Sequence, residues 1–316
     1  MTPKISVNIG KLKLKNPVMV ASGAFGYAEE FKGFLDLKGL GALVSKTITL
    51  KPRQGNPAPR TCETPAGMLN SIGLENPGVE KFIKEKLPIL KKIGVPVIVS
   101  IASEKDPDEF VTLAKRLDKI KEVNAIELNI SCPNIKPPAA GRQPPAENSQ
   151  SLISQDPKAT YSIVERVRKA TKKTIITKLS PNVTDIVEVA LAAESAGSDA
   201  VSLINTLTGM AIDITKRAPK IASVTGGLSG PAIRPVAVRM AWEIAQKINI
   251  PIIGMGGIID ASSALEFFIA GATAVSVGTA NFVNPGITAE IISGIKKYLI
   301  KNNIKDIKSL VGSLNI

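Results

Sequence analysis

The residues with the clearest capacity for chemistry lie in one short stretch, Asn129–Asn134, which holds two amides, a hydroxyl and a thiol. The stretch directly follows an apolar run, Ala125–Leu128, which we expect to be a strand, and Pro133 turns the chain there. A packed core has little use for so many hydrogen-bonding groups, because each needs a partner or costs free energy. We therefore expect these side chains to meet a ligand where the strand ends.

The thiol in this stretch is the candidate for proton transfer. The chain has no histidine, which excludes Ser-His-Asp and Cys-His triads and histidine bases. A free thiol has a pKa of about 8.5 and needs only a modest shift to act as a base, so Cys132 is a candidate base, with a structural cysteine as the alternative. Cys62 has no comparable setting. Two distant cysteines form neither a disulfide framework nor a zinc pattern, and we expect no metal site.

The composition sets limits on the partners. The 316 residues are 44% hydrophobic and 21% charged, and the net charge is +13. This charge indicates an anionic partner, such as a phosphate cofactor, an acidic substrate or a nucleic acid, or else a plain lysine-rich surface. Aromatic residues make up only 4%, so base-stacking platforms are scarce and we expect no nucleic-acid partner. No apolar run reaches the roughly 20 residues of a membrane helix and no apolar signal core is present, so we expect a cytoplasmic protein that binds no membrane.

Short apolar runs alternate with amphipathic stretches along the chain. Because the runs are continuously apolar, they favour parallel strands buried on both faces. Eight such strands alternating with helices predict an α/β fold, a (β/α)8 TIM barrel with long active-site loops, as a single domain over residues 1–316. A doubly wound sheet is the alternative, but Ser22–Gly26 after the first strand lacks the dinucleotide-binding glycine pattern. The predicted strands are Val18–Ala21, Ala42–Ser45, Val95–Ile101, Ala125–Leu128, Thr174–Leu179, Ala200–Ile204, Pro251–Gly254 and Thr273–Val277.

Acidic residues mark the starts of several helices. Asp106 before Pro107 predicts an N-cap followed by a first-turn proline. Asp185 with Glu188 is spaced like a capping box, and Asp260 opens a further helix.

Three features break the regular alternation. Pro88 is expected to interrupt the helical pattern Val79–Leu90. The first insertion, Lys51–Gly78, and a second, proline-rich one at about residues 135–156 are long for a compact domain, and such loops are usually functional or disordered.

Barrel enzymes place their chemistry at the carboxyl ends of the strands. Gly256–Gly257 and Gly278–Thr279 follow the last two predicted strands, where barrels bind phosphate through backbone N–H groups. Gly226–Gly230 is expected to add a flexible loop. Plain turn glycines are the alternative, whereas a phosphate site implies a ligand such as a nucleotide or FMN.

Two lysines, Lys46 and Lys178, also end apolar strands. A buried, unpaired ammonium is costly, so each should face an anion or a polar ligand. A flavin would provide one, because its reduced ring carries negative charge that a lysine stabilises. The alternative is an internal salt bridge with a carboxylate such as Glu127.

Taken together, these motifs resemble a known family, the class 1 dihydroorotate dehydrogenases. The likeness is to the branch that forms the catalytic subunit of an NAD-linked enzyme. The resemblance covers about Val7 to Leu299. The motifs that carry it are Asn129–Asn134, Asn70–Leu74, Lys178–Asn182, Ile204–Thr206, Gly226–Gly230, Gly254–Gly257 and Val277–Asn281.

The resemblance implies an FMN-binding barrel that oxidises dihydroorotate to orotate in pyrimidine biosynthesis. Cys132 would take the C5 proton while hydride leaves C6 for the flavin. The substrate would be held by Lys46, Asn70, Ser71, Ile72, Gly73, Leu74, Asn129, Asn134, Asn205 and Thr206. FMN would be held by Ser22, Lys46, Thr47, Ser100, Asn129, Lys178, Ile204, Gly230, Gly256, Gly257, Gly278 and Thr279.

Two departures from the family accompany the resemblance. Ser100 stands where the family usually has Asn, and a proline-rich insertion begins after Lys136 in place of a short glycine-rich loop. The resemblance also implies an iron–sulfur and FAD electron-transfer subunit, and a homodimer or heterotetramer, while fumarate or a quinone stay open as acceptors. A uracil-ring-reducing FMN barrel and a non-catalytic nucleic-acid-binding protein are the rival functions.

Overall fold

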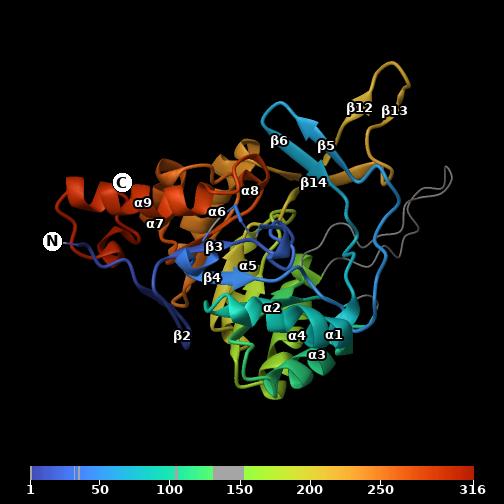
Figure 1. Ribbon diagram of the computed structural model, residues 1–316, viewed down its shortest axis with the longest axis horizontal. Coiled ribbons are helices and arrows are strands. Elements are labelled where there is room, and N and C mark those ends of the chain that lie inside the picture. Colours follow the sequence, from blue (N-terminus) through green and yellow to red (C-terminus); the bar gives the residue numbers. More distant parts are fainter. Residues whose placement is uncertain (1, 32, 35, 104–105, 131–152) are drawn as a thin grey trace.

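The protein is described by a computed structural model over residues 2–31, 33–34, 36–103, 106–130 and 153–316. Eight parallel strands close into a barrel in which each strand pairs with the next along the chain and the last pairs with the first (Figure 1). This confirms the predicted (β/α)8 barrel, and every predicted strand is present with ends shifted by at most two residues. The barrel strands are β3 (Val18–Val20), β4 (Ala42–Val44), β7 (Val97–Ile101), β8 (Ala125–Asn129), β9 (Thr174–Lys178), β10 (Ala200–Leu203), β15 (Ile252–Gly254) and β16 (Ala274–Val277).

Helices surround the barrel because each buries one apolar stripe against the strands. In α3, for example, Phe110, Leu113 and Leu117 are buried at helical spacing. The helices are α1 (Gly78–Lys81), α2 (Leu87–Lys92), α3 (Asp108–Asp118), α4 (Pro157–Ala170), α5 (Ile186–Ser195), α6 (Arg234–Ala245), α7 (Ala261–Ala270), α8 (Ala280–Val283) and α9 (Ile287–Lys301). Short 3-10 turns span Glu29–Phe31, Leu37–Gly39, Ile153–Gln155, Pro231–Ile233 and Ile307–Leu310.

The helix starts differ in detail from the prediction. Pro107 precedes α3, and Asp106 accepts a hydrogen bond from the backbone N–H of Asp108 at 2.9 Å, so the helix begins after the proline. At α5, Asp185 caps the helix through Val187 N–H, but Glu188 does not complete the box.

A reciprocal capping box occurs instead at α7, where it was not predicted. Asp260 Oδ1 accepts from Ser263 N–H at 2.7 Å, and Ser263 Oγ accepts from Asp260 N–H at 3.0 Å. The backbone N–H of Ser263 lowers the pKa of the Asp260 carboxyl, so this helix start is held by an ionised cap near neutral pH.

The helical pattern Val79–Leu90 is interrupted just before Pro88, as predicted, although the chain stays helical through the interruption. The turn Phe82–Lys86 widens to a π-helix between α1 and α2, and Pro88 lies in the first turn of α2, where its missing N–H is tolerated.

Outside the barrel, small antiparallel sheets contain strands that the sequence did not predict. The first insertion forms the hairpin β5 (Thr61–Thr64) and β6 (Gly67–Asn70), which continues into β14 (Thr225–Ser229) and β11 (Leu207–Met210). The expected loop Gly226–Gly230 is therefore mostly a strand. Its glycines allow tight packing, because a Cβ on Gly227 would lie 2.0 Å from Thr206 Oγ1. The pair β12 (Ile212–Asp213) and β13 (Ala218–Pro219) projects from the molecule in Figure 1, and β1 (Val7–Ile9) pairs with β2 (Leu12–Leu14).

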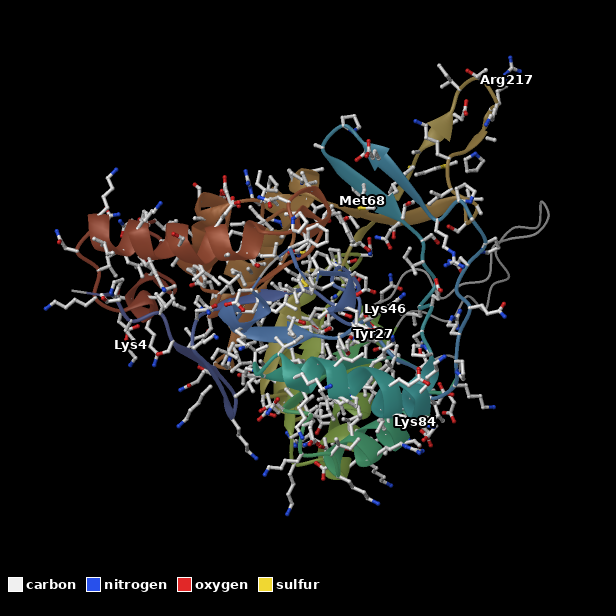
Figure 2. All side chains as sticks on the ribbon, in the orientation of Figure 1. Lys4, Tyr27, Lys46, Met68, Lys84 and Arg217 are labelled. Atoms are coloured by element: carbon white, nitrogen blue, oxygen red, sulfur yellow. The ribbon has the colours of Figure 1, made fainter. Side chains whose placement is uncertain are left out.

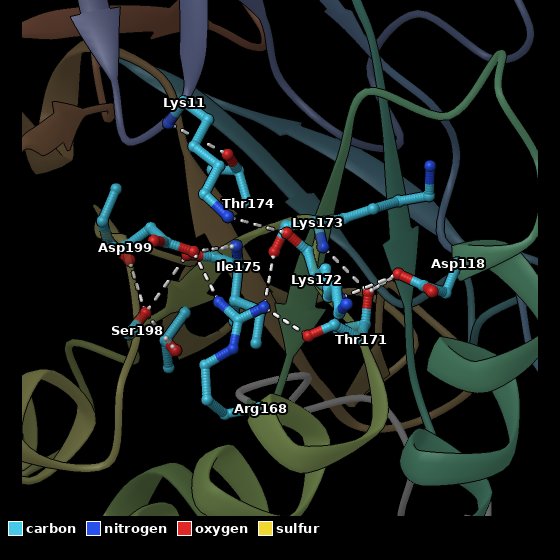
Figure 3. A network of polar contacts seen from close by, with 12 residues as sticks. Lys11, Asp118, Arg168, Thr171, Lys172, Lys173, Thr174, Ile175, Ser198 and Asp199 are labelled. Carbon is cyan, nitrogen blue, oxygen red and sulfur yellow. Dashed lines mark hydrogen bonds and ion pairs between the residues drawn. The ribbon is translucent and has the colours of Figure 1, made fainter.

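A polar network closes the barrel at the amino ends of β9 and β10, opposite the strand ends that carry the predicted chemistry (Figure 3). Arg168 of α4 donates to Asp199 Oδ2 at 2.8 Å and to the carbonyl of Lys173 at 2.9 Å. Asp118 accepts from Thr171 Oγ1 at 2.6 Å, and this hydrogen bond lowers the pKa of its carboxyl. The network therefore ties the carboxyl ends of α3 and α4 to the starts of β9 and β10.

The second predicted insertion lies largely outside the described residues, as do Ser131, Cys132 and Asn134. No helix within the described part of the chain is both long and apolar enough to cross a membrane.

Candidate active site

A cavity of about 360 Å³ lies at the carboxyl ends of the barrel strands. This volume is in the range of small-molecule and cofactor sites. Most of the predicted site residues line it, although they come from segments spread over the whole chain. They are Ser22, Lys46, Thr47, Asn70, Ile72, Gly73, Leu74, Asn129, Lys178, Ile204, Asn205, Thr206, Gly230, Gly256, Gly257, Gly278 and Thr279.

The hydroxyl of Thr47 is the centre of a hydrogen-bond cluster in the cavity wall. Its Oγ1 lies 3.0 Å from Ser22 Oγ, 2.9 Å from Ser100 Oγ and 3.1 Å from Asn129 Nδ2. Ser22 donates its own proton to the carbonyl of Ser45 at 2.9 Å. Ser22 therefore accepts from Thr47, and Thr47 accepts from both Ser100 and Asn129. The donor and acceptor directions of the whole cluster follow from this one carbonyl.

The cluster also fixes the orientation of the Asn129 amide. Its Nδ2 donates to Thr47, and its Oδ1 accepts from Asn205 Nδ2 at 3.3 Å. Asn205 Oδ1 in turn accepts from the backbone N–H of Thr206 at 2.8 Å. Asn129 has a second N–H on the same nitrogen, which has no partner within the described residues. The cavity thus presents amides of defined polarity to a ring edged with N–H and C=O groups.

Two predicted contact residues do not line the cavity. Ser100 is fully buried, and its hydroxyl reaches the site only through Thr47. Ser71 is 1% exposed, and its Oγ accepts from Asn56 Nδ2 at 2.8 Å, so it braces the loop that carries Ile72 and Gly73.

Both predicted lysines line the cavity, Lys46 after β4 and Lys178 at the end of β9, with β7 and β8 between them in the barrel. Lys46 is half-buried, and its backbone N–H donates to the carbonyl of Gly26 at 3.0 Å; in Figure 2 it is labelled beside Tyr27 near the middle of the view, whereas Lys84 and Arg217 are labelled towards the edges. Lys178 is 5% exposed, and its ammonium makes no hydrogen bond or ion pair with any described residue. The salt bridge with Glu127, which the sequence left open, is not formed. A buried ammonium of this kind is suited to an anionic or polar ligand.

The last two strands end in unused backbone donors. Among the described residues, the N–H groups of Gly256, Gly257, Gly278 and Thr279 donate to no other group. The Thr279 hydroxyl donates to Ser229 Oγ at 2.8 Å, which ties this end to the small sheet. Free N–H groups around a cavity are suited to bind an anion, which is the role that the sequence suggested for this end of the barrel.

The glycines here are required for two different reasons. Gly256 and Gly257 have φ of 124° and 71°, and a Cβ on Gly256 would lie 2.9 Å from Ala237 Cβ in α6. These two positions therefore require glycine because of backbone conformation and packing, whether or not a ligand binds. A Cβ on Gly278, by contrast, would meet only Ala21 Cβ, at 3.7 Å. At Gly278 the absent side chain leaves open space that a ligand can fill, which is the fit expected of a phosphate-bearing cofactor such as FMN.

Several lining residues were not predicted. Thr61, Met68 and Ser229 cover the cavity from the small sheet, and Ile259 and Phe282 form part of its rim. The length of the Lys51–Gly78 insertion was the only signal in the sequence for the first two. The sequence held no signal for Ile259 and Phe282, because isolated apolar residues after a strand are common.

Comparisons with known proteins agree with this geometry. The family model described as dihydroorotate dehydrogenase matches residues 4–299. A protein of Trichlorobacter lovleyi named dihydroorotate dehydrogenase B (NAD(+)), catalytic subunit, is 54% identical over 314 residues, or 99% of each chain. Proteins with the same name from Desulforudis audaxviator and a Thermoanaerobacter species are 53% and 52% identical, covering 99% of this chain and 98% and 99% of their own.

Proposed function

Because this chain belongs to the dihydroorotate dehydrogenase family, we propose that its cavity holds dihydroorotate against FMN and that Cys132 is the base of the reaction. The chain is an FMN-dependent oxidoreductase that converts dihydroorotate to orotate in pyrimidine biosynthesis. The oxidation removes a proton from C5 and a hydride from C6 of the ring.

The observation that carries the proposal is that one cavity combines free backbone N–H groups with a buried lysine whose ammonium has no partner among the described residues. The free N–H groups after β15 and β16 would hold the phosphate, and the Lys178 ammonium would face the ring of the cofactor. FMN, when bound, supplies the hydride acceptor.

The remaining roles fall to residues of the chain itself. The Asn129 and Asn205 amides, oriented through Thr47, would fix the rotation of the substrate ring. Lys46 would pair with the substrate carboxylate. Cys132, as a thiolate, would accept the C5 proton, because the chain has no histidine to do so.

The direct test is to purify the protein and record its visible spectrum. We expect a yellow protein whose flavin absorbance is bleached by dihydroorotate without oxygen and perturbed by orotate. A colourless protein that cannot be reconstituted with FMN would refute the proposal.

The partner is a further part of the proposal. The relatives are named catalytic subunits of an NAD(+) enzyme. The chain has two cysteines, fewer than the four thiolates that hold a common iron–sulfur cluster. We therefore propose that a second subunit with iron–sulfur and FAD centres passes the electrons to NAD. This chain would form a single domain, and two copies would make a cytoplasmic homodimer to which the second subunit binds. Steady-state oxidation with NAD, fumarate and quinone acceptors, with and without co-purified subunits, tests this assignment, and turnover with NAD by the isolated chain would contradict it.

Gly278→Ala should weaken FMN binding without weakening the fold. The new methyl group would stand on the cavity wall, where overpacking costs about 1–3 kcal/mol, so we expect a roughly tenfold to hundredfold rise in the FMN dissociation constant. Flavin fluorescence titration of the apoprotein measures the affinity, and thermal melting measures the fold.

Two matched substitutions separate these effects. Gly39→Ala adds a methyl group with nothing within 4 Å and should change neither quantity. Gly256→Ala should lower the melting temperature of the apoprotein, because its φ of 124° is unfavourable for alanine. If Gly278→Ala binds FMN as tightly as the unaltered protein, FMN does not contact this glycine.

A further inference from the structure

Glu127 is a buried carboxylate that no step of the proposed reaction uses. It lies in β8, is 2% exposed, and its Oε2 accepts one hydrogen bond from Ser202 Oγ at 3.2 Å. Its Oε1 has no hydrogen-bond partner among the described residues. An ionised carboxylate so poorly supplied with donors requires an opposite charge nearby to remain in the interior.

The opposite charge lies on the next strand. Within the described part of the chain, Glu127 and Lys178 are the only two charged side chains that are more than nine-tenths buried. Lys178 in β9 is in register with Asn129 in β8, two residues beyond Glu127, and also with Ser202 in β10. The Glu127 carboxyl, bonded to Ser202, therefore spans the interior face of β9 just below Lys178.

The positions of these groups along their strands decide which of them can contact a ligand in the cavity. Asn129 and Lys178 line the cavity, whereas Glu127 does not. Two residues of a strand span about 7 Å, so the Glu127 backbone lies that far below Asn129, and its side chain does not reach the cavity wall. It touches no ligand, but its charge acts through the low-dielectric barrel interior on the ammonium and on anything above it.

We propose that Glu127 is a positioning residue that sets the electrostatic potential at the flavin ring by opposing the field of Lys178. This inference rests on the proposed function, since it requires FMN above Lys178. Lys178 favours the negative charge that the ring gains on reduction, and Glu127 disfavours it. The pair keeps the buried site close to neutral when the cofactor is oxidised.

The test is the midpoint potential of bound FMN in Glu127→Gln. Glutamine keeps the size of the side chain and an oxygen for Ser202 but removes the charge. A unit charge roughly 10 Å away at an effective dielectric constant of about 20 changes an equilibrium on the order of tenfold. We expect reduced FMN to be favoured by that factor, so that the potential rises by about 30 mV for a two-electron couple.

Companion variants make the result specific. Glu165→Gln removes the same charge from the surface of α4, where Glu165 pairs with Lys169, and should leave the potential unchanged. Lys178→Met should lower the potential, and the double variant should fall between the two single variants. If Glu127→Gln does not fold, Ser202→Ala removes the one hydrogen bond that the carboxylate accepts among the described residues, frees its charge to move away from the ring, and should change the potential by a smaller amount.

The apoprotein provides a second measurement that does not involve the cofactor. Each single variant removes the buried opposite charge on the neighbouring strand from the one that remains, so both should melt at a lower temperature than the unaltered protein, and the double variant should lose less than the sum of the two. Failure to bind FMN would reject the proposed function. Bound FMN with an unchanged potential in Glu127→Gln, or additive losses of stability, would reject the role of Glu127 alone.

Discussion

Cys132→Ala should bind FMN normally but reduce it with dihydroorotate about 10²–10⁴-fold more slowly, which is the usual contribution of a positioned base. Alanine removes the thiol without adding bulk, so binding of substrate and cofactor should persist. Stopped-flow bleaching of the flavin without oxygen isolates this step from reoxidation. The rate in the unaltered protein should rise with pH as the thiol ionises, because only the thiolate accepts a proton.

The second cysteine provides the control for this experiment. Cys62 lies in β5 and does not line the cavity, so Cys62→Ala should reduce its flavin at the rate of the unaltered protein. Cys132→Ser should fall between the two, because a hydroxyl is a weaker base at neutral pH. A Cys132→Ala protein that bleaches as fast as the unaltered one would remove the thiol from the reaction.

Lys178→Met should slow the same step by about 10²–10³-fold, the usual cost of losing one preorganised group that faces developing charge. The physical reason is the setting of the ammonium, which is 5% exposed and has no described partner other than what enters the cavity. Methionine retains most of the side-chain length and packing. The FMN content must first be measured by absorbance, so that weaker cofactor binding is not mistaken for slower chemistry.

Lys169→Met is the matched control, since it removes a lysine of 70% exposed side chain from the far surface of α4. It should leave the reduction rate within about twofold of the unaltered protein, because exposed ion pairs contribute little. Should Lys178→Met, fully loaded with FMN, match this control, the lysine would have no electrostatic role in reduction.

Local sequence determined the barrel and the ends of its strands. Continuously apolar runs such as Val97–Ile101 can be buried only between two layers, and eight of them alternating with helices leave few other folds. The glycines and lysines that follow these runs could be assigned to one end of the barrel because parallel strands all end on the same side. The motifs around Asn129 and Lys178 added the family, and with it the cofactor and the substrate.

Only the tertiary structure shows which side chains of the site contact one another. Ser100 was expected to touch the flavin, yet its hydroxyl is bonded to Thr47, 53 residues away, and is covered by it. Glu127 and Ser202 are 75 residues apart and meet across β9, although Ser202 lies two residues further along the register of the three strands than Glu127. Glycines expected in a loop pair as a strand because Thr206 approaches Gly227 too closely for any side chain. Such contacts depend on closure of the barrel, and no local pattern encodes which distant side chain will arrive.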